Sequence, residues 1–166
     1  MKTKILVYGI TLCSLIAGCN SNPKNNGGDQ TNNLPSTSQE KSMSKDISFS
    51  LAKNYFVKNT VKHLDDPKIE TPEKFNEIFG MAATMSKDGK PTAIDFSNQY
   101  VIAVLKPETD LETTLTPVGI QKNQGNEIVL TYKTIVGPKQ SFTTRPIMIV
   151  IVDKTENGKV VLNELN

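Results

Sequence analysis

The chain has 166 residues, of which 37% are hydrophobic, 19 are basic and 17 are acidic. Lys2 and Lys4 are the only charged residues before Cys19, so the rest of the chain carries 17 side chains of each sign. This balance argues against nucleic acid as a partner, because nucleic-acid-binding proteins usually show a basic footprint on one face. It also argues against a polybasic attachment to anionic lipids.

Residues 1–18 have the pattern of an export signal. A short basic start precedes an apolar run at residues 5–17, which is shorter than the roughly 20 residues needed to span a membrane. The run ends in Ile16-Ala17-Gly18-Cys19, two small residues followed by a thiol. These residues resemble the lipobox of bacterial lipoproteins, which implies cleavage before Cys19 and acyl chains such as palmitate attached to it. The alternatives are an ordinary secretory signal with a chance cysteine, or an uncleaved anchor.

The residues after Cys19 suggest where an anchored protein would be held. Asn20 is not Asp, which by analogy with enteric bacteria favours the outer membrane. No acidic run follows Cys19, and this favours a periplasmic orientation. We therefore expect a position in the cell envelope, at the outer membrane and facing the periplasm, with membrane attachment through acyl chains on Cys19.

Composition divides the remainder into a tether and a domain. Residues 20–46 are rich in Asn, Ser, Gly, Gln and Lys, with only Leu34 and Met43 as sizeable apolar residues. Such a segment cannot bury enough apolar surface to fold, so residues 19–46 are predicted to be the lipidated cysteine and a flexible tether. Residues 47–166 have the length of a single domain.

The first part of the domain contains one clear helix signal. Residues 53–59 favour a strand, with a helix as the alternative. Thr71, Pro72 and Glu73 then form a helix start, in which Thr71 caps and Pro72 takes the first helical position. The apolar spacing predicts a short helix over residues 72–79, with Gly80 as its C-terminal cap and residues 81–83 as a possible extension.

The sequence pattern of the later part of the domain is typical of β-sheet. Residues 99–105 form a nearly continuous apolar run, as expected of a strand covered on both faces. Pro117 indicates an edge or bulged strand. The remaining expected strands alternate or are strongly apolar, and the full set is residues 99–105, 113–122, 127–136, 145–152 and 159–165. The predicted fold class is α+β, mainly antiparallel β-sheet (a sandwich or half-barrel), with one short helix near residues 72–80.

The inventory of reactive side chains is small. His63 is the only histidine, and its neighbours Asp65 and Asp66 place it in a polar loop. A zinc site generally needs three or four nitrogen or sulfur ligands, so no metal site is predicted. The carboxylates of Asp95 and of Glu108, Asp110 and Glu112 keep an acid–base enzyme formally open, although the last three fall in a loop-like stretch, residues 107–113. We expect no cofactor and no enzyme activity.

Two features could bind a partner. Residues 137–142 read as a loop between two strong strands, and this loop would expose Phe142. Arg145, followed by Pro146, begins the core strand, and an arginine held at the end of a sheet can bind a carboxylate through two hydrogen bonds. Phe142 and Arg145 are therefore the candidate binding residues.

Two further resemblances bear on function. Asp95-Phe96-Ser97 before an apolar strand, a hairpin, and Arg145-Pro146 before a second apolar strand resemble the C-terminal domain of PrcB-type protease-complex lipoproteins. That domain usually carries Thr-Gly-Gly-Tyr where this chain has Pro107-Glu108-Thr109-Asp110. Residues 55–59 and 79–83 resemble small uncharacterised lipoproteins of Bacteroides.

Together these features predict a lipid-anchored envelope lipoprotein whose domain binds a protein without catalysis. The first alternative, implied by the strand and Arg-Pro arrangement, is an inhibitor or regulator of an envelope protease. The second is a carboxylate-based enzyme.

Overall fold

The computed structural model describes residues 44–82, 85 and 89–165. The predicted signal, Cys19 and nearly all of the predicted tether lie outside these residues. The described elements, in chain order, are β1 (Lys45–Asp46), β2 (Phe49–Leu51), β3 (Tyr55–Val57), β4 (Lys68–Ile69), α1 (Pro72–Ile78), β5 (Phe79–Met81), β6 (Gln99–Leu105), β7 (Thr109–Lys122), β8 (Glu127–Thr144), β9 (Ile147–Asp153) and β10 (Lys159–Leu165).

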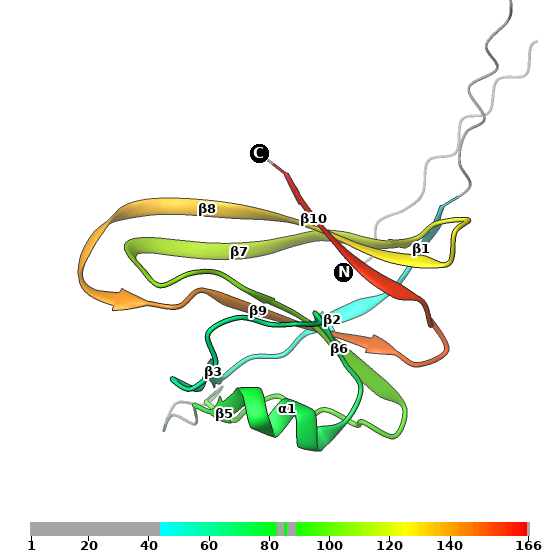
Figure 1. Cartoon of the computed structure of the whole chain (residues 1–166), viewed down its shortest axis with the longest axis horizontal. Coiled ribbons are helices and arrows are strands. Elements are labelled where there is room, and N and C mark those ends of the chain that lie inside the picture. The colour runs from blue at the N-terminus through cyan, green and yellow to red at the C-terminus, as the bar shows by residue number, and fades with distance from the viewer. Residues whose placement is uncertain (1–43, 83–84, 86–88, 166) are drawn as a thin grey trace, which may run out of the picture. The chain divides into compact units, whose positions relative to one another are not determined.

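One long hairpin, bent back over itself, forms most of the fold. At its base, β6 pairs antiparallel with β9, up to Leu105 opposite Ile147. Farther out, β7 pairs antiparallel with β8, and the N–H of Lys106 donates to the carbonyl of Pro146 at 2.9 Å between the two ladders. Both strands turn together near residues 106–112 and 137–146, so that the outer half of the hairpin lies over its base (Figure 1). We call residues 99–153 the folded hairpin.

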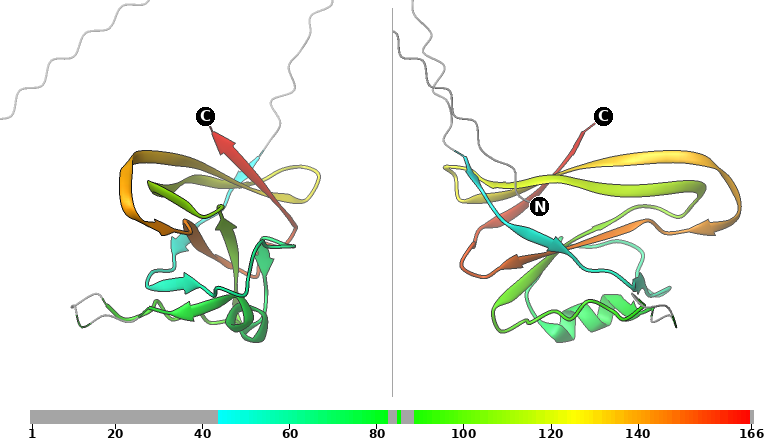
Figure 2. Two further views of the ribbon diagram at one scale, coloured as in Figure 1. Left: turned by 60° about the vertical axis from the view of Figure 1, so that its left-hand side comes forward. Right: turned by 180° about the vertical axis from the view of Figure 1, so that it is seen from behind.

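Each half of the folded hairpin supplies the two central strands of a four-stranded sheet. Sheet A has the order β1-β7-β8-β10, and sheet B has the order β2-β9-β6-β4. All pairings are antiparallel except that of β10 with β8, which is parallel. A small third sheet pairs β3 with β5 and lies with α1 on the far side of sheet B (Figure 2). The molecule is therefore layered as sheet A, sheet B, and then the helix with its small sheet.

Sheet B is buried on both faces, as the continuous apolar run in β6 predicted. Alternate residues point to opposite faces of a strand. Tyr100, Ile102 and Val104 face sheet A, whereas Val101 and Ala103 face α1, and all of them are at most 2% exposed. In β9 the even-numbered residues likewise face sheet A, and the odd-numbered residues face α1. Each fully buried Val or Ile contributes about 1.5–3 kcal/mol, so the central strands account for much of the folding energy.

The helix begins as predicted and ends differently. Thr71 is extended and accepts the N–H of Lys74 at 3.3 Å, so the predicted cap is confirmed. The predicted C-terminal cap at Gly80 and the extension of the helix into residues 81 and 82 are wrong, because Phe79 is already extended and Phe79–Met81 is strand β5; the last residue of that extension, Ala83, lies outside the described residues. Phe75, on the buried face of the helix, packs against the rings of Tyr55, Phe79 and Phe96 at centroid distances of 5.1, 5.0 and 5.5 Å.

The outer half of the hairpin is longer than its sequence predicts. Pro117 sits beside a register shift, which confirms the predicted bulge. The predicted loop at residues 137–142 is wrong, because β8 continues through it to Thr144, and the loop-like stretch before Thr113 also contains the start of β7. Local Gly and Pro signals fail here because three register shifts accommodate these residues within the ladder. The fold class is α+β as predicted, in its sandwich form, and residues 55–57 are a strand.

Candidate functional site

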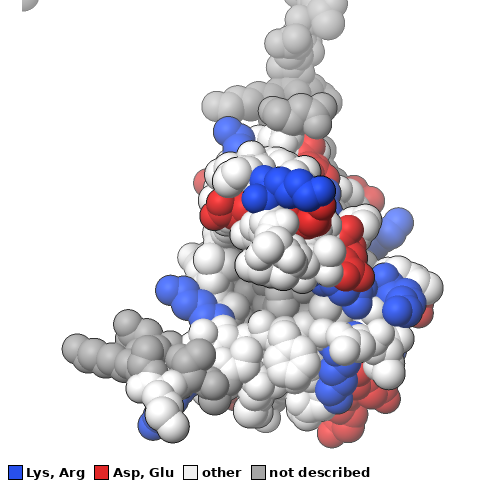
Figure 3. Space-filling view, turned by 90° about the vertical axis from the view of Figure 1, so that its left-hand side faces the viewer, with Lys and Arg blue, Asp and Glu red and all other residues white. Residues whose placement is uncertain are grey.

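Exposed apolar side chains gather where the folded hairpin bends. This end of the domain, which we call the corner face, carries five large apolar side chains that remain 37–58% exposed: Leu51, Phe56, Leu111, Val136 and Phe142. In the view onto this end, uncharged surface runs between groups of charged side chains and is hollowed below the upper strands (Figure 3). Among these charges, Asp110 and Lys139 pair with each other at 2.8 Å.

Two adjoining hollows lie in the corner face. One has a volume of about 410 Å³ and is lined by Phe56, Glu108 and Arg145 among others. The other has a volume of about 380 Å³ and is lined by Leu51 and Leu115 among others. Tyr55 and Ile147 line both, so the hollows form one groove between the bent hairpin and β3.

Phe56 lies at the rim of this groove and packs against a glycine. It lies in β3 directly opposite Gly80 of β5, and its side chain is 49% exposed. A Cβ atom on Gly80 would come within 2.4 Å of the Phe56 ring, so the end of the ring occupies the space that a side chain at position 80 would need. Gly80 therefore permits the close approach of an aromatic ring that stays half exposed.

The strand that carries Phe56 is itself anchored. Asn54, just before β3, has a positive φ of 63°, and its side-chain amide donates to the carbonyl of Lys90 at 2.9 Å. The Tyr55 hydroxyl donates to the carbonyl of Thr92 at 2.7 Å. Burial raises the pKa of this hydroxyl, so it stays a donor at neutral pH. The floor of the groove is thus preorganised.

The two residues predicted to bind a partner both lie at this end. Phe142 is 58% exposed, although it belongs to β8 rather than to a loop. Arg145 lines the larger hollow, but its guanidinium donates to the carbonyls of Val61 and Lys62, the latter at 3.0 Å. A guanidinium has five N–H donors, and these two bonds leave others for a ligand. Arg145 thus ties the chain near residue 61 to the corner face.

The carboxylates considered for catalysis do not converge. Asp95 precedes β6 and accepts the side-chain amide of Asn98 at 2.8 Å, which lowers its pKa. Glu108 follows β6 at its other end, so the two acids are separated by the length of a seven-residue strand, about 20 Å. His63 is 79% exposed with Nε2 2.9 Å from Asp65. Within residues 44–82, 85 and 89–165, no group of three His, Cys, Asp or Glu side chains is placed to hold a metal ion.

A polar cluster missed by the sequence reasoning joins the two sheets. Glu164 of β10 accepts from Lys106, Thr134 and the hydroxyl of Tyr132, the last at 3.2 Å. The hydrogen bond from Lys106 holds the pKa of Glu164 below its usual value. Burial is the largest influence on the pKa of Lys106 and acts to lower it, but hydrogen bonds and charge interactions with Glu164 and Tyr132 together outweigh it, so the net shift is upward. Lys106 and Glu164 neutralise each other's charge, so the cluster links the two sheets and does not present a reactive group.

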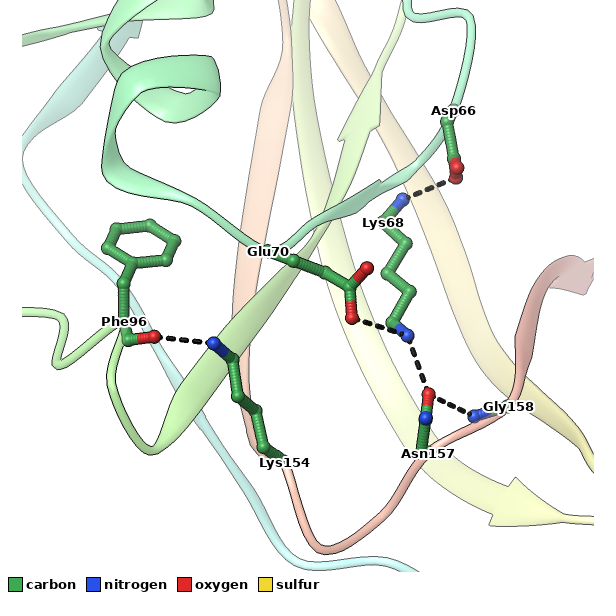
Figure 4. Close-up of polar contacts among 7 residues, drawn as sticks. All are labelled: Asp66, Lys68, Glu70, Phe96, Lys154, Asn157 and Gly158. Carbon is green, nitrogen blue, oxygen red and sulfur yellow. Dashed lines mark hydrogen bonds and ion pairs between the residues drawn. The ribbon is translucent and has the colours of Figure 1, made fainter.

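A second polar cluster closes the opposite end of the domain (Figure 4). The ammonium of Lys68 pairs with Glu70 and donates to the side chain of Asn157, both at 2.8 Å. Lys154 donates to the carbonyl of Phe96 at 2.6 Å. These contacts tie β4 and the start of β6 to the turn between β9 and β10, and they use their donors within the chain. This end is a clamp rather than a site.

The signals for the corner face were scattered in the sequence. Phe56 and Gly80 lie 24 positions apart in the chain, and only the pairing of β3 with β5 makes them neighbours. Among the described residues, no helix combines the length and apolar character needed to cross a membrane. Comparisons with known protein families, with curated proteins and with solved structures found no match.

Proposed function

We propose that the chain is a lipid-anchored lipoprotein of the cell envelope whose domain binds another protein through the corner face and catalyses no reaction. The anchor is supported by the lipobox at residues 16–19. The binding role is supported above all by Phe56, an exposed aromatic side chain braced by Gly80 beside a groove.

A braced aromatic ring favours binding for a thermodynamic reason. Protein interfaces are enriched in aromatic side chains, and a few such anchors supply most of the binding energy. Each flexible side chain that must be immobilised on binding costs about 0.5–1.5 kcal/mol. The Phe56 ring already packs against Gly80 in the free domain, so we expect part of this loss to be avoided. The partner is therefore expected to insert an apolar side chain into the groove beside Phe56.

The corner face is also placed well for an anchored protein. The described chain begins at β1, where Lys45 lies opposite Lys122 near the tip of the folded hairpin. From Lys122 to Thr113, near the bend, β7 covers nine residue steps, about 30 Å of strand. An anchor upstream of β1 therefore holds the domain by the end opposite to the corner face.

The alternative, regulation of an envelope protease, remains a prediction. It depends on Arg145 as a ligand for the protease, and this guanidinium already donates to Val61 and Lys62. We therefore place the general protein-binding role first.

The binding proposal is tested with a photo-crosslinking amino acid in the full chain in intact cells. Placed at Phe142, the probe should give a discrete product with a second protein, and Phe56→Asp should abolish that product. Val118 is the matched control position, because it is similarly exposed (54%) and belongs to a hollow near Phe49 instead. Equal products at positions 142 and 118, or a product unaffected by Phe56→Asp, would contradict the proposal.

The anchor is tested separately by labelling. The full chain should incorporate labelled palmitate and fractionate with membranes, and Cys19→Ala should lose the label. Unchanged labelling of Cys19→Ala would refute the lipobox. Because binding at the corner face does not depend on the acyl chains, each of the two experiments can fail without the other.

A further inference from the structure

The free edges of the two large sheets differ in how they are protected. A free edge strand exposes backbone N–H and C=O groups and can pair with another chain, unless it is short, bulged or interrupted by proline. The edges formed by β1, β2 and β4 have only two or three residues. The side of β7 not covered by β1 contains Pro117 and three register shifts. These edges are all poor templates for pairing.

Among the outermost strands of sheets A and B, β10 is the exception. The strand has seven residues, contains no Pro or Gly, and pairs with β8 in uninterrupted register from Lys159 to Leu165. Its first half contains the apolar run Val160-Val161-Leu162. No other described strand lies on its outer side. It is therefore a regular edge, free to accept a further strand.

The two faces of β10 are defined by its contacts. Val160 is packed in the core between the sheets, and Glu164 meets Tyr132 there, so even-numbered residues face inward. Asn163 meets Thr131 on the outer face, so odd-numbered residues face outward. Leu162 faces inward but remains 37% exposed, beside a hollow of about 370 Å³ that Tyr132 and His63 also line. A hollow therefore lies beside the inner face of β10 at Leu162.

We propose that β10 pairs antiparallel with β10 of a second copy, about a two-fold axis at Val161. Directly opposed residues of an antiparallel pair lie on the same face of the sheet. In this register Val161 faces Val161 on the outside, and Val160 faces Leu162 on the inside. Lys159 faces Asn163, so no like charges oppose each other. The result is one continuous sheet of two four-stranded halves, each with the order given above.

The sequence of β10 selects this register over its neighbour. Shifting the axis to Leu162 keeps the faces matched but places Val160 against Glu164, an apolar side chain against a carboxylate. Glu164 is also held by Lys106 and Thr134 within its own chain. The register centred on Val161 leaves that cluster undisturbed, and an isologous pairing of this kind closes as a dimer.

The register is tested with Val161→Cys in the full chain, oxidised mildly in membranes. Opposed residues have Cα atoms about 4.5–5.5 Å apart, within the roughly 4.4–6.8 Å that a disulfide spans. Leu165→Cys is the control, because Leu165 is also exposed but would lie about 26 Å from its own copy, by eight strand steps. We expect Val161→Cys to form the covalent dimer at least 10-fold faster, and the parent chain reports any contribution from Cys13 and Cys19.

A mixed experiment separates this pairing from chance collisions. Copies with Lys159→Cys mixed with copies with Asn163→Cys should crosslink to each other, while each variant alone should not. Unfolding curves of the four cysteine variants check that the fold is retained. Equal dimer formation at positions 161 and 165 would overturn the proposal, as would a disulfide from Val161→Cys to a different protein instead of to a second copy.

Discussion

The layered arrangement predicts that two isoleucines on opposite faces of sheet B are equally costly to remove. Ile102 faces sheet A and is 0% exposed, and Ile151 faces α1 and is 4% exposed. Truncating a buried isoleucine to alanine costs about 2–5 kcal/mol, the lost transfer energy plus the cavity left behind. We therefore expect Ile102→Ala and Ile151→Ala each to lower the free energy of unfolding by about 3.5 kcal/mol. Ile135→Ala is the control, because Ile135 is 57% exposed.

The size of this effect makes it easy to measure. Domains of this kind have a total stability of about 5–15 kcal/mol. A urea m value of about 1.8 kcal/mol/M turns the expected loss into a shift of about 2 M in the urea midpoint of the full chain. Ile135→Ala should change the stability by about 0.5 kcal/mol or less, as surface substitutions do, and so shift the midpoint by under about 0.3 M. If Ile151→Ala behaves like Ile135→Ala while Ile102→Ala shows the full shift, the helix does not cover sheet B.

Three further predictions follow from single contacts. Gly80→Ala should push the Phe56 ring out of place and so reduce crosslinking from position 142, with a smaller midpoint shift than Ile151→Ala. The lowered pKa of Glu164 means that its stabilisation is present above its unfolded pKa and is lost as pH falls. Glu164→Gln should therefore destabilise at pH 7 and progressively less below about pH 4.3. Burial, with Glu156 and Glu70 nearby, raises the pKa of Tyr100 to about 12, and its hydroxyl has no hydrogen-bond partner among the described residues. Tyr100→Phe should thus leave the absorbance titration below pH 11 unchanged and cause no loss of stability.

Local chemistry predicted the elements whose structure depends on neighbours in sequence. Thr71 caps because its hydroxyl reaches a backbone N–H three residues on, and this needs no tertiary contact. The continuous apolar run of β6 likewise predicted burial on both faces of the strand, because the pattern lies within one short stretch of sequence. The sequence could not show that Gly80 serves a ring 24 positions away, or that residues 137–142 remain in the ladder. Those outcomes depend on pairing between distant segments, which overrides the local preference of Gly and Pro.

The same limit applied to the candidate site. Phe142 and Arg145 were predicted from residue type alone, and both lie at the corner face. Their neighbours come from other segments of the chain, and the partners of Arg145 are backbone carbonyls whose positions no side-chain pattern predicts. The exposure of Phe56 could not be predicted from the neighbouring sequence. An aromatic residue in a short strand is usually a core residue, and only the pairing of β3 with β5 shows that Phe56 lies opposite a glycine.

The direction of β10 links the two proposals. Because β10 runs parallel to the first part of β8, it points from the hairpin tip toward the corner face. Antiparallel pairing of two copies therefore directs their corner faces to opposite ends of the shared sheet, and the two starts of β1 are likewise placed at opposite ends. An anchor on each copy would then attach the dimer at both ends of the shared sheet, whereas a single copy would be attached at the end opposite to its corner face. Locking the dimer through Val161→Cys should consequently change crosslinking from position 142 in membranes but leave it unaltered once the protein is released by Cys19→Ala.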